Sequence, residues 1–132
     1  EWETVLSKTE DHFLHKRKNN QHRTWLWNDL KMESYSISCS QDPYQSLELL
    51  IHPNEQLFFL LNETINEQTK YWCYEGKLSA IVKVIGNSKL MDEYYLVSKK
   101  YDWFLALNHH NVLIGSGSIT SRMKAEETQI QS

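Results

Sequence analysis

The chain has 132 residues, 40% of them hydrophobic and 12% aromatic, with a formal net charge of -3 at pH 7. This length fits one folded domain, and the apolar content excludes an intrinsically disordered chain. Neither charge sign dominates a long stretch, and nothing approaches the run of about 18 apolar residues that a membrane-spanning helix needs, so we expect one soluble domain over residues 1–132 that does not bind a membrane.

The N-terminal part of the chain predicts an amphipathic helix over residues 4–18, inside an N-terminal unit that we place at 1–22. Its apolar residues recur with helical spacing. Basic residues at 16–18 suit the negative end of the helix dipole, which accounts for most of the basic cluster at 12–23. A nucleic-acid-binding patch is the alternative reading of that cluster.

The next part of the chain alternates strand and helix patterns. Residues 25–27 (WLW) fit either a helical turn or a short strand. Residues 35–39 alternate apolar and small polar side chains, which is typical of a strand with one buried face. An Asp-Pro pair predicts the start of a helix over 43–51. The continuous apolar run at 57–61 (LFFLL) predicts a central strand covered on both faces.

Three further elements follow from the pattern beyond that strand. Residues 71–74 (YWCY) predict a strand that ends at Glu75-Gly76 and pairs with LFFLL. Residues 77–86 have apolar side chains at i, i+3, i+4 and i+7, which favours a helix, with a strand as the second choice. The polar tail at 120–132 is expected to be helical, and its inner face would consist of Met123, Glu127 and Ile130.

The stretch 93–119 is expected to be the structural centre of the molecule. Residues 94–97 and 103–107 are short aromatic and branched runs that suit a pleated, half-buried surface, and the polar residues between them suit a hairpin turn. Residues 108–111 predict a second reversal, because Asn tolerates the left-handed conformation of tight turns. A third strand then follows, in which two glycines mark a bulge or a close backbone approach.

These elements predict an α+β fold with a largely antiparallel sheet. Its C-terminal part is a β-meander, and it is packed by an N-terminal helix and two further helices at 43–51 and 77–86. The core is expected over 24–119. Cys39 and Cys73 lack CxxC spacing, and we expect two reduced, buried thiols.

Several motifs in the chain occur together in a known family. They are WLW, DPYxxLxxLI, LFFLLNE, YWCYEG and, above all, YYLVSKKYDWFLALNHHNVLIGSG. They resemble a family of small bacterial proteins classed as a domain of unknown function, over residues 24–119. The family pattern has Asp after the two histidines where this chain has Asn111, which removes a carboxylate. The resemblance implies a bacterial, cytosolic setting, and by analogy only the size and character are similar to those of immunity proteins that neutralise toxins by binding.

The enzyme hypothesis depends on two adjacent histidines. His109 or His110 would act as general acid or base, oriented by Asp102, with the hydroxyl of Ser98 or Ser116 as its partner. This set is typical of a small hydrolase or nuclease, although no GxSxG elbow is present. On a regular strand the two imidazoles would face opposite sides of the sheet, so they would serve one site only in a turn.

Metal and nucleotide sites have weak support in the sequence. Apart from the pair His12 and His15, the histidines lack the spacing of a metal-ligand set. The GSG sequence lacks the third glycine and the lysine of phosphate-binding loops. We therefore expect no metal and no cofactor. Aromatic side chains of the sheet are the kind that stack on bases, which keeps nucleic-acid binding as an alternative that the net negative charge disfavours.

The leading hypothesis is a non-enzymatic domain that binds another protein, of the immunity or antitoxin type. It predicts a sheet face or groove with solvent-accessible aromatic rings. The expected contact residues are Tyr101, Trp103, Asn108, His109, His110 and Asn111. The competing structural explanation is that the Asn and His side chains hold a tight turn by hydrogen bonds to the backbone.

Overall fold

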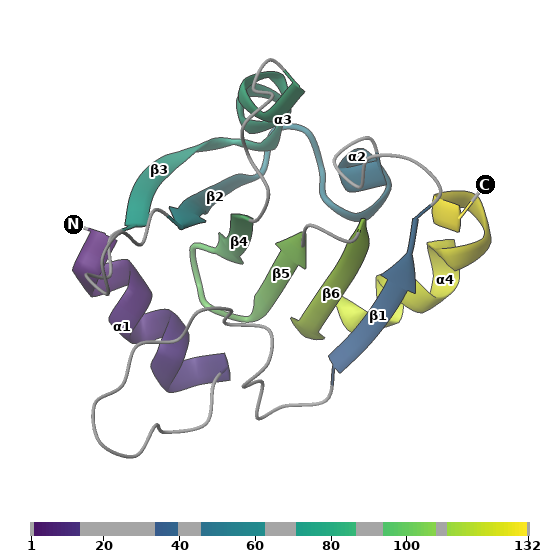
Figure 1. Ribbon diagram of the computed structural model, residues 1–132, viewed down its shortest axis with the longest axis horizontal. Helices are drawn as coiled ribbons and strands as arrows, with labels where there is room; N and C mark the ends of the chain where they lie inside the picture. The colour runs from purple at the N-terminus through teal and green to yellow at the C-terminus, as the bar shows by residue number, and fades with distance from the viewer. Residues whose placement is uncertain are drawn as a thin grey trace.

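The computed structural model describes residues 2–13, 34–39, 46–62, 71–86, 94–107 and 111–131. The strands are β1 (Ser34–Ser38), β2 (Gln56–Asn62), β3 (Tyr71–Lys77), β4 (Tyr94–Ser98), β5 (Trp103–Leu107) and β6 (Val112–Gly117). They form a six-stranded antiparallel sheet in the order β1-β6-β5-β4-β2-β3 (Figure 1). The helices are α1 (Trp2–Phe13), α2 (Leu47–Leu50), α3 (Leu78–Gly86) and α4 (Thr120–Gln131). The predicted α+β class and the C-terminal meander are confirmed.

Among the described residues, no helix combines the length and the apolar character that crossing a bilayer requires. Predicted elements at residues 14–18, 25–27 and 43–45 lie outside the described residues. Asn108, His109 and His110, which follow β5, also lie outside the described residues.

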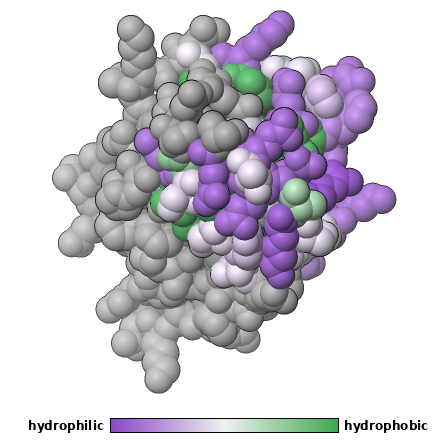
Figure 2. All heavy atoms as spheres, turned by 90° about the vertical axis from the view of Figure 1, so that its right-hand side faces the viewer, coloured by the Kyte–Doolittle hydropathy of each residue, from purple (hydrophilic) through white to green (hydrophobic). Residues whose placement is uncertain are grey.

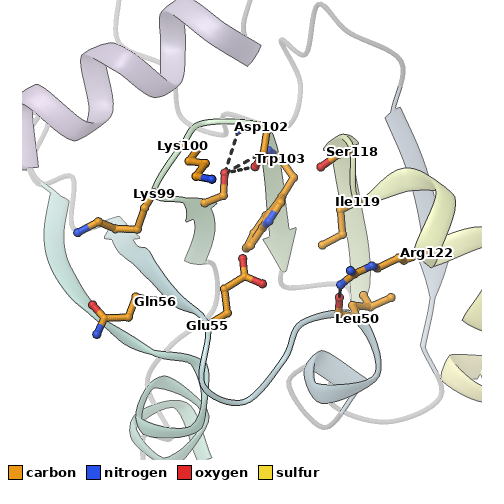
Figure 3. Close-up of a pocket in the computed structure, with 11 residues that line it drawn as sticks. Leu50, Glu55, Gln56, Lys99, Lys100, Asp102, Trp103, Ser118, Ile119 and Arg122 are labelled. Carbon is orange, nitrogen blue, oxygen red and sulfur yellow. Dashed lines mark hydrogen bonds between the residues drawn. The ribbon is translucent and has the colours of Figure 1, made fainter.

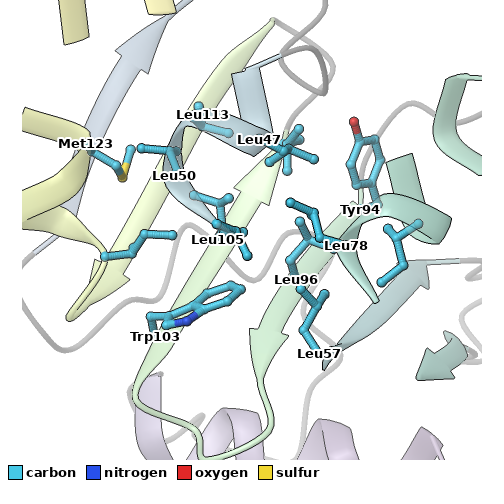
Figure 4. Close-up of a cluster of buried hydrophobic side chains, with 14 of the residues drawn as sticks. Leu47, Leu50, Leu57, Leu78, Tyr94, Leu96, Trp103, Leu105, Leu113 and Met123 are labelled. Carbon is cyan, nitrogen blue, oxygen red and sulfur yellow. The ribbon is translucent and has the colours of Figure 1, made fainter. Parts of the chain in front are cut away.

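Both faces of β4 and β5 are buried, and alternate side chains enter two separate cores. Leu96 and Leu105 point to the face that α2, α3 and α4 cover, where Leu47 and Met123 meet them (Figure 4). Tyr95 and Phe104 point to the opposite face. The expectation of a half-buried surface for these strands is wrong, because every residue of both strands is buried. Each large side chain removed from water in this way contributes about 1.5–3 kcal/mol.

Helix α1 covers the second face. Its buried residues are Val5, Leu6, Thr9 and Phe13, which recur with helical spacing. The ring of Phe13 lies 5.6 Å from that of Phe104, and the buried hydroxyl of Thr9 donates a 2.7 Å hydrogen bond to the Val5 carbonyl. The helix begins at Trp2, two residues before the predicted start.

Strand β2 is central, as predicted, because it pairs with β3 on one side and β4 on the other. The prediction that β3 ends at Glu75-Gly76 is wrong. Gly76 pairs with Leu57, and the strand continues to Lys77. A glycine does not end a strand when its backbone stays paired with the neighbouring strand. Helix α3 then begins at Leu78, whose N–H donates to the Glu55 carbonyl at 3.0 Å, and the predicted helix is confirmed.

Helix α2 covers Leu47–Leu50 of the predicted 43–51 helix, whose first three residues lie outside the described part of the chain. It ends at Leu50, because Ile51 adopts an extended conformation with φ -131° and ψ 135°. Leu47 and Leu50 are both buried. The short turn therefore serves to insert two leucines into the core above β5.

Helix α4 confirms the predicted C-terminal helix. Met123 and Ile130 are buried against the sheet, and the half-buried Glu127 accepts a short hydrogen bond from the Tyr35 hydroxyl of β1. This hydrogen bond raises the pKa of Tyr35. Gly115 confirms the predicted close approach, since a Cβ there would collide with the sulfur of Met123.

Cys39 and Cys73 are free thiols, and each is half-buried rather than buried as expected. Cys39 lies just beyond the end of β1, and its partial burial raises the pKa of the thiol. Cys73 lies on β3, an edge strand that pairs with β2 on one side and with no strand of the described sheet on the other.

Candidate functional site

The turn between β4 and β5 is organised by one buried hydroxyl. Ser98, 4% exposed, donates a hydrogen bond to the Asp102 carboxylate at 2.5 Å. The same oxygen accepts hydrogen bonds from the backbone N–H groups of Asp102 at 2.9 Å and Trp103 at 3.3 Å. Tyr101 lies in the left-handed region with φ 59°. The hydroxyl therefore fixes where β5 begins and how Trp103 enters the sheet.

The end of β6 lies against this turn. Gly117 has φ 85°, and a Cβ at that position would collide with the Asp102 carbonyl oxygen. The next residue, Ser118, donates its N–H to the same carbonyl at 2.9 Å. Because α4 starts two residues later, this contact places the first turn of α4 beside the β4–β5 turn.

A pocket of about 440 Å³ opens between this turn, the segment that leads into β2 and the first turn of α4. We call it the Trp103 pocket. Its apolar wall consists of Leu50, Trp103 and Ile119, all of them buried. Figure 3 shows the Trp103 ring extending from β5 into this space, toward Glu55. The pocket thus combines an aromatic wall with polar groups, as ligand sites commonly do.

The charged residues of the lining carry both signs of charge. They are Glu55, Lys99, Lys100, Asp102 and Arg122. Because the Lys99 ammonium pairs with Glu75, which does not line the pocket, two cations and two carboxylates remain for the pocket itself. The pocket is therefore formally neutral, whereas the whole chain carries -3.

Some of these charges already have partners. The Lys99 ammonium lies 2.6 Å from the Glu75 carboxylate and 4.9 Å from the Phe58 ring centroid, and Figure 3 shows it pointing away from the pocket. Arg122 donates one hydrogen bond from Nη1 to the Leu50 carbonyl at 2.8 Å.

Other charges remain available to a ligand. Within the described ranges, the side chains of Glu55 and Lys100 form no ion pair or hydrogen bond. Figure 3 shows Glu55 below the Trp103 ring and Arg122 beside Leu50 and Ile119. An acceptor and a donor therefore face the same space without contacting each other.

A second hollow of about 380 Å³ adjoins the first between α2 and α4. The two share Leu50 and Arg122, so Arg122 lies at their boundary. Leu49, 40% exposed, supplies apolar surface there, and His52 and Glu126 supply polar groups. The coloured part of this side of the molecule in Figure 2 is mainly hydrophilic with small apolar areas, which suits a polar contact surface rather than a hydrophobic one.

The residues predicted for the site lie in different places. Asp102 and Trp103 both line the pocket. Tyr101 lies near α1 instead, with its ring 5.3 Å from that of His12 and 5.9 Å from that of Phe58. Asn111 is exposed ahead of β6, and its φ of 58° agrees with the predicted left-handed turn residue.

The predicted catalytic set is only partly within the described residues. Asn108, His109 and His110 lie outside them. Ser98 and Asp102 are hydrogen-bonded to each other, whereas Ser116 is fully buried in β6. No histidine of the described chain lines the Trp103 pocket, and the described ranges contain no group of three or more potential metal ligands.

Sequence reasoning missed Glu55, Lys100 and Arg122. They come from the approach to β2, the β4–β5 turn and α4. No spacing rule links positions so far apart, because only the strand order brings them to one place. The one usable signal was Trp103, a large ring at the start of a strand.

Replacing Ser98 with alanine is expected to destabilise the protein by about 1–3 kcal/mol. The change leaves two backbone N–H groups and one carboxylate oxygen without their described partner. Urea unfolding followed by circular dichroism measures the effect. Ser118→Ala, an exposed serine in the same pocket, should change stability by less than about 0.5 kcal/mol, and equal effects of the two changes would contradict the role assigned to Ser98.

Comparison with known proteins gives one match. A family model described as a family of unknown function, DUF6756, matches residues 1–127. No curated protein matches the chain, and no solved structure matches it. The match extends beyond the 24–119 stretch whose motifs suggested an uncharacterised family, and it confirms that suggestion. Since it covers nearly the whole chain, the protein belongs to the DUF6756 family of unknown function.

Proposed function

We propose that this protein is a non-enzymatic domain that binds another protein through the Trp103 pocket. The observation that supports it most is the combination of an aromatic wall with polar groups that lack partners within the described residues, Glu55 and Lys100. Tryptophan and arginine are the residue types that most often dominate binding energy at protein interfaces. By analogy of size and character, we place the protein among immunity-like or antitoxin-like proteins of the bacterial cytoplasm.

The enzyme alternative receives less support from the geometry. A serine nucleophile attacks through a lone pair of its oxygen, but the Ser98 oxygen already accepts hydrogen bonds from two backbone N–H groups. A hydrolase or nuclease using His109 or His110 needs an imidazole within reach of Asp102. Asp102 precedes β5, and both histidines follow it, so the strand separates Asp102 from Leu107 by roughly 16 Å.

Nucleic-acid binding through sheet aromatics also has little support. Both sheet faces are covered by helices, and Tyr94, Tyr95 and Phe104 are buried. Tyr74, 52% exposed, is the only exposed aromatic ring among the side chains that the structure describes. One ring does not make the row of stacking surfaces that such a mode requires.

Affinity capture from the source cell with matched charge reversals tests the proposal. Glu55→Lys is expected to weaken capture of a specific partner at least about tenfold, which corresponds to about 1.4 kcal/mol. Glu3→Lys makes the same change at an exposed position on α1 and should leave capture intact. Calorimetry with the purified partner then gives the two dissociation constants.

Equal binding by both variants would contradict the Trp103 pocket as the contact site. The double variant His109→Ala/His110→Ala separates the remaining alternatives. A partner that this variant still binds at full strength supports binding at the pocket. Loss of a turnover reaction in a folded double variant would support catalysis instead.

A further inference from the structure

We infer that the Trp103 pocket recognises the C-terminal carboxylate of a partner polypeptide whose last residue has an apolar side chain. This inference rests on the proposed function and names the chemical group that the pocket takes. Its basis is the placement of opposite charges, apolar wall and adjoining hollow around one space.

Two cations of the pocket, Arg122 and Lys100, can attract an anion. Arg122 uses Nη1 for the Leu50 carbonyl, and a guanidinium has five N–H donors, so several remain for a ligand. Lys100 contributes an ammonium that forms no ion pair with the described residues. Guanidinium groups match the two oxygens of a carboxylate particularly well.

Glu55 restricts which anion fits. A phosphate with two negative charges would be repelled by this carboxylate more strongly than a singly charged anion. The last residue of a polypeptide carries one negative charge and, one carbon away, a backbone N–H. Its carboxylate would bind Arg122 while the N–H donates to Glu55, which lies between Arg122 and Lys100 in the view of Figure 3. Both signs of charge are then satisfied by one terminal residue.

The apolar wall and the second hollow specify the rest of the ligand. Leu50, Trp103 and Ile119 would contact the terminal side chain, and replacing water there by an apolar group is favourable. A volume of about 440 Å³ lies within the range of ligand pockets and exceeds what a carboxylate alone fills. The adjoining hollow at Leu49 and His52 continues the site past Arg122. The second hollow gives room for the residues that precede the C-terminal residue of the partner polypeptide. A free amino acid has no such residues.

A titration of the full-length protein with two matched probes tests the inference. The probes are N-acetyl-glycyl-glycyl-leucine as the free acid and the same peptide as its C-terminal amide. We expect millimolar free acid to shift the NMR signals of the Trp103 indole N–H and the Arg122 Nε–H in a saturable way. The amide should bind at least about tenfold more weakly, and inorganic phosphate should not shift these signals.

Variants assign the effect to the pocket. Lys100→Gln should weaken binding of the free acid several-fold, whereas Lys83→Gln, the same change at an exposed position on α3, should not. Arg122→Gln should weaken binding further, and thermal unfolding shows whether it also disturbs the Leu50 contact. The Lys100 side chain forms no hydrogen bond or ion pair with the described residues. Weaker binding by Lys100→Gln therefore reports on the ligand and not on a disturbed fold.

Three results would overturn the inference. They are equal affinities for acid and amide, signal shifts produced by phosphate alone, and no shift with either peptide. In each case the capture experiment still decides the proposed function separately, because a partner whose binding depends on Glu55 would keep the Trp103 pocket as a protein contact site with a different ligand group.

Discussion

Replacing Phe104 with alanine is expected to lower the free energy of unfolding by about 3–5 kcal/mol. Phe104 is fully buried in β5, and its ring lies 5.6 Å from those of both Phe13 and Tyr95. Alanine would leave a cavity between α1 and the sheet that rigid strands cannot close. For a domain whose total stability is about 5–15 kcal/mol, this loss is a large fraction. Urea unfolding at constant m-value measures it.

Tyr74→Ala is the matched control for the loss of a ring. Tyr74 is 52% exposed on the edge strand β3, although its ring lies 6.0 Å from that of Phe59. Its removal should cost less than about 1 kcal/mol. If Phe104→Ala cost no more than this control, α1 would not be covering the second sheet face, and the two-core description would fail.

The second large effect is expected for Gly117→Ala, at about 2–4 kcal/mol. A non-glycine residue at φ 85° is strained by about 1–2 kcal/mol. The added Cβ would also collide with the Asp102 carbonyl oxygen and lie 3.1 Å from the Trp103 Cα. These are backbone atoms, so relief requires the β4–β5 turn to move, and we expect the Trp103 indole NMR signal to shift.

Gly76→Ala provides the comparison for this second prediction. Gly76 lies in β3, and a Cβ there would meet nothing within 4 Å. Alanine reduces the freedom of the unfolded chain, so the change should be neutral or stabilising by up to about 1 kcal/mol. A Gly117→Ala protein as stable as Gly76→Ala would show that the turn accommodates the methyl group without strain.

Most of the fold follows from local sequence pattern. Residues 94–97 and 103–107 are aromatic and branched runs bounded by turn formers, so they predict β4 and β5 without any knowledge of the rest. The spacing of Met123 and Ile130 likewise predicts the inner face of α4. Local patterns failed where burial depends on distant elements. Nothing in β4 itself shows that α1, some 80 residues away in the chain, covers Tyr95 and Val97.

The site was far less predictable than the fold. Tyr101 and Trp103 are two residues apart, which in a regular strand puts both side chains on one face. The positive φ of Tyr101 breaks that rule, and the two rings lie at different places. Glu55 and Arg122 look like ordinary surface charges in the sequence. Their place in the pocket depends on the order of the strands in the sheet. That order cannot be read from the residues around each position.

The pairing of β1 with β6 has a consequence for protein synthesis. Ser34 pairs with Ser116 and Ser38 with Val112, so β1 leaves the ribosome long before its neighbour in the sheet. At about 5–20 residues per second, the delay is roughly 4–15 seconds. Throughout that interval the emerging chain presents an incomplete sheet to chaperones and proteases, and β6 closes it when it emerges between β1 and β5.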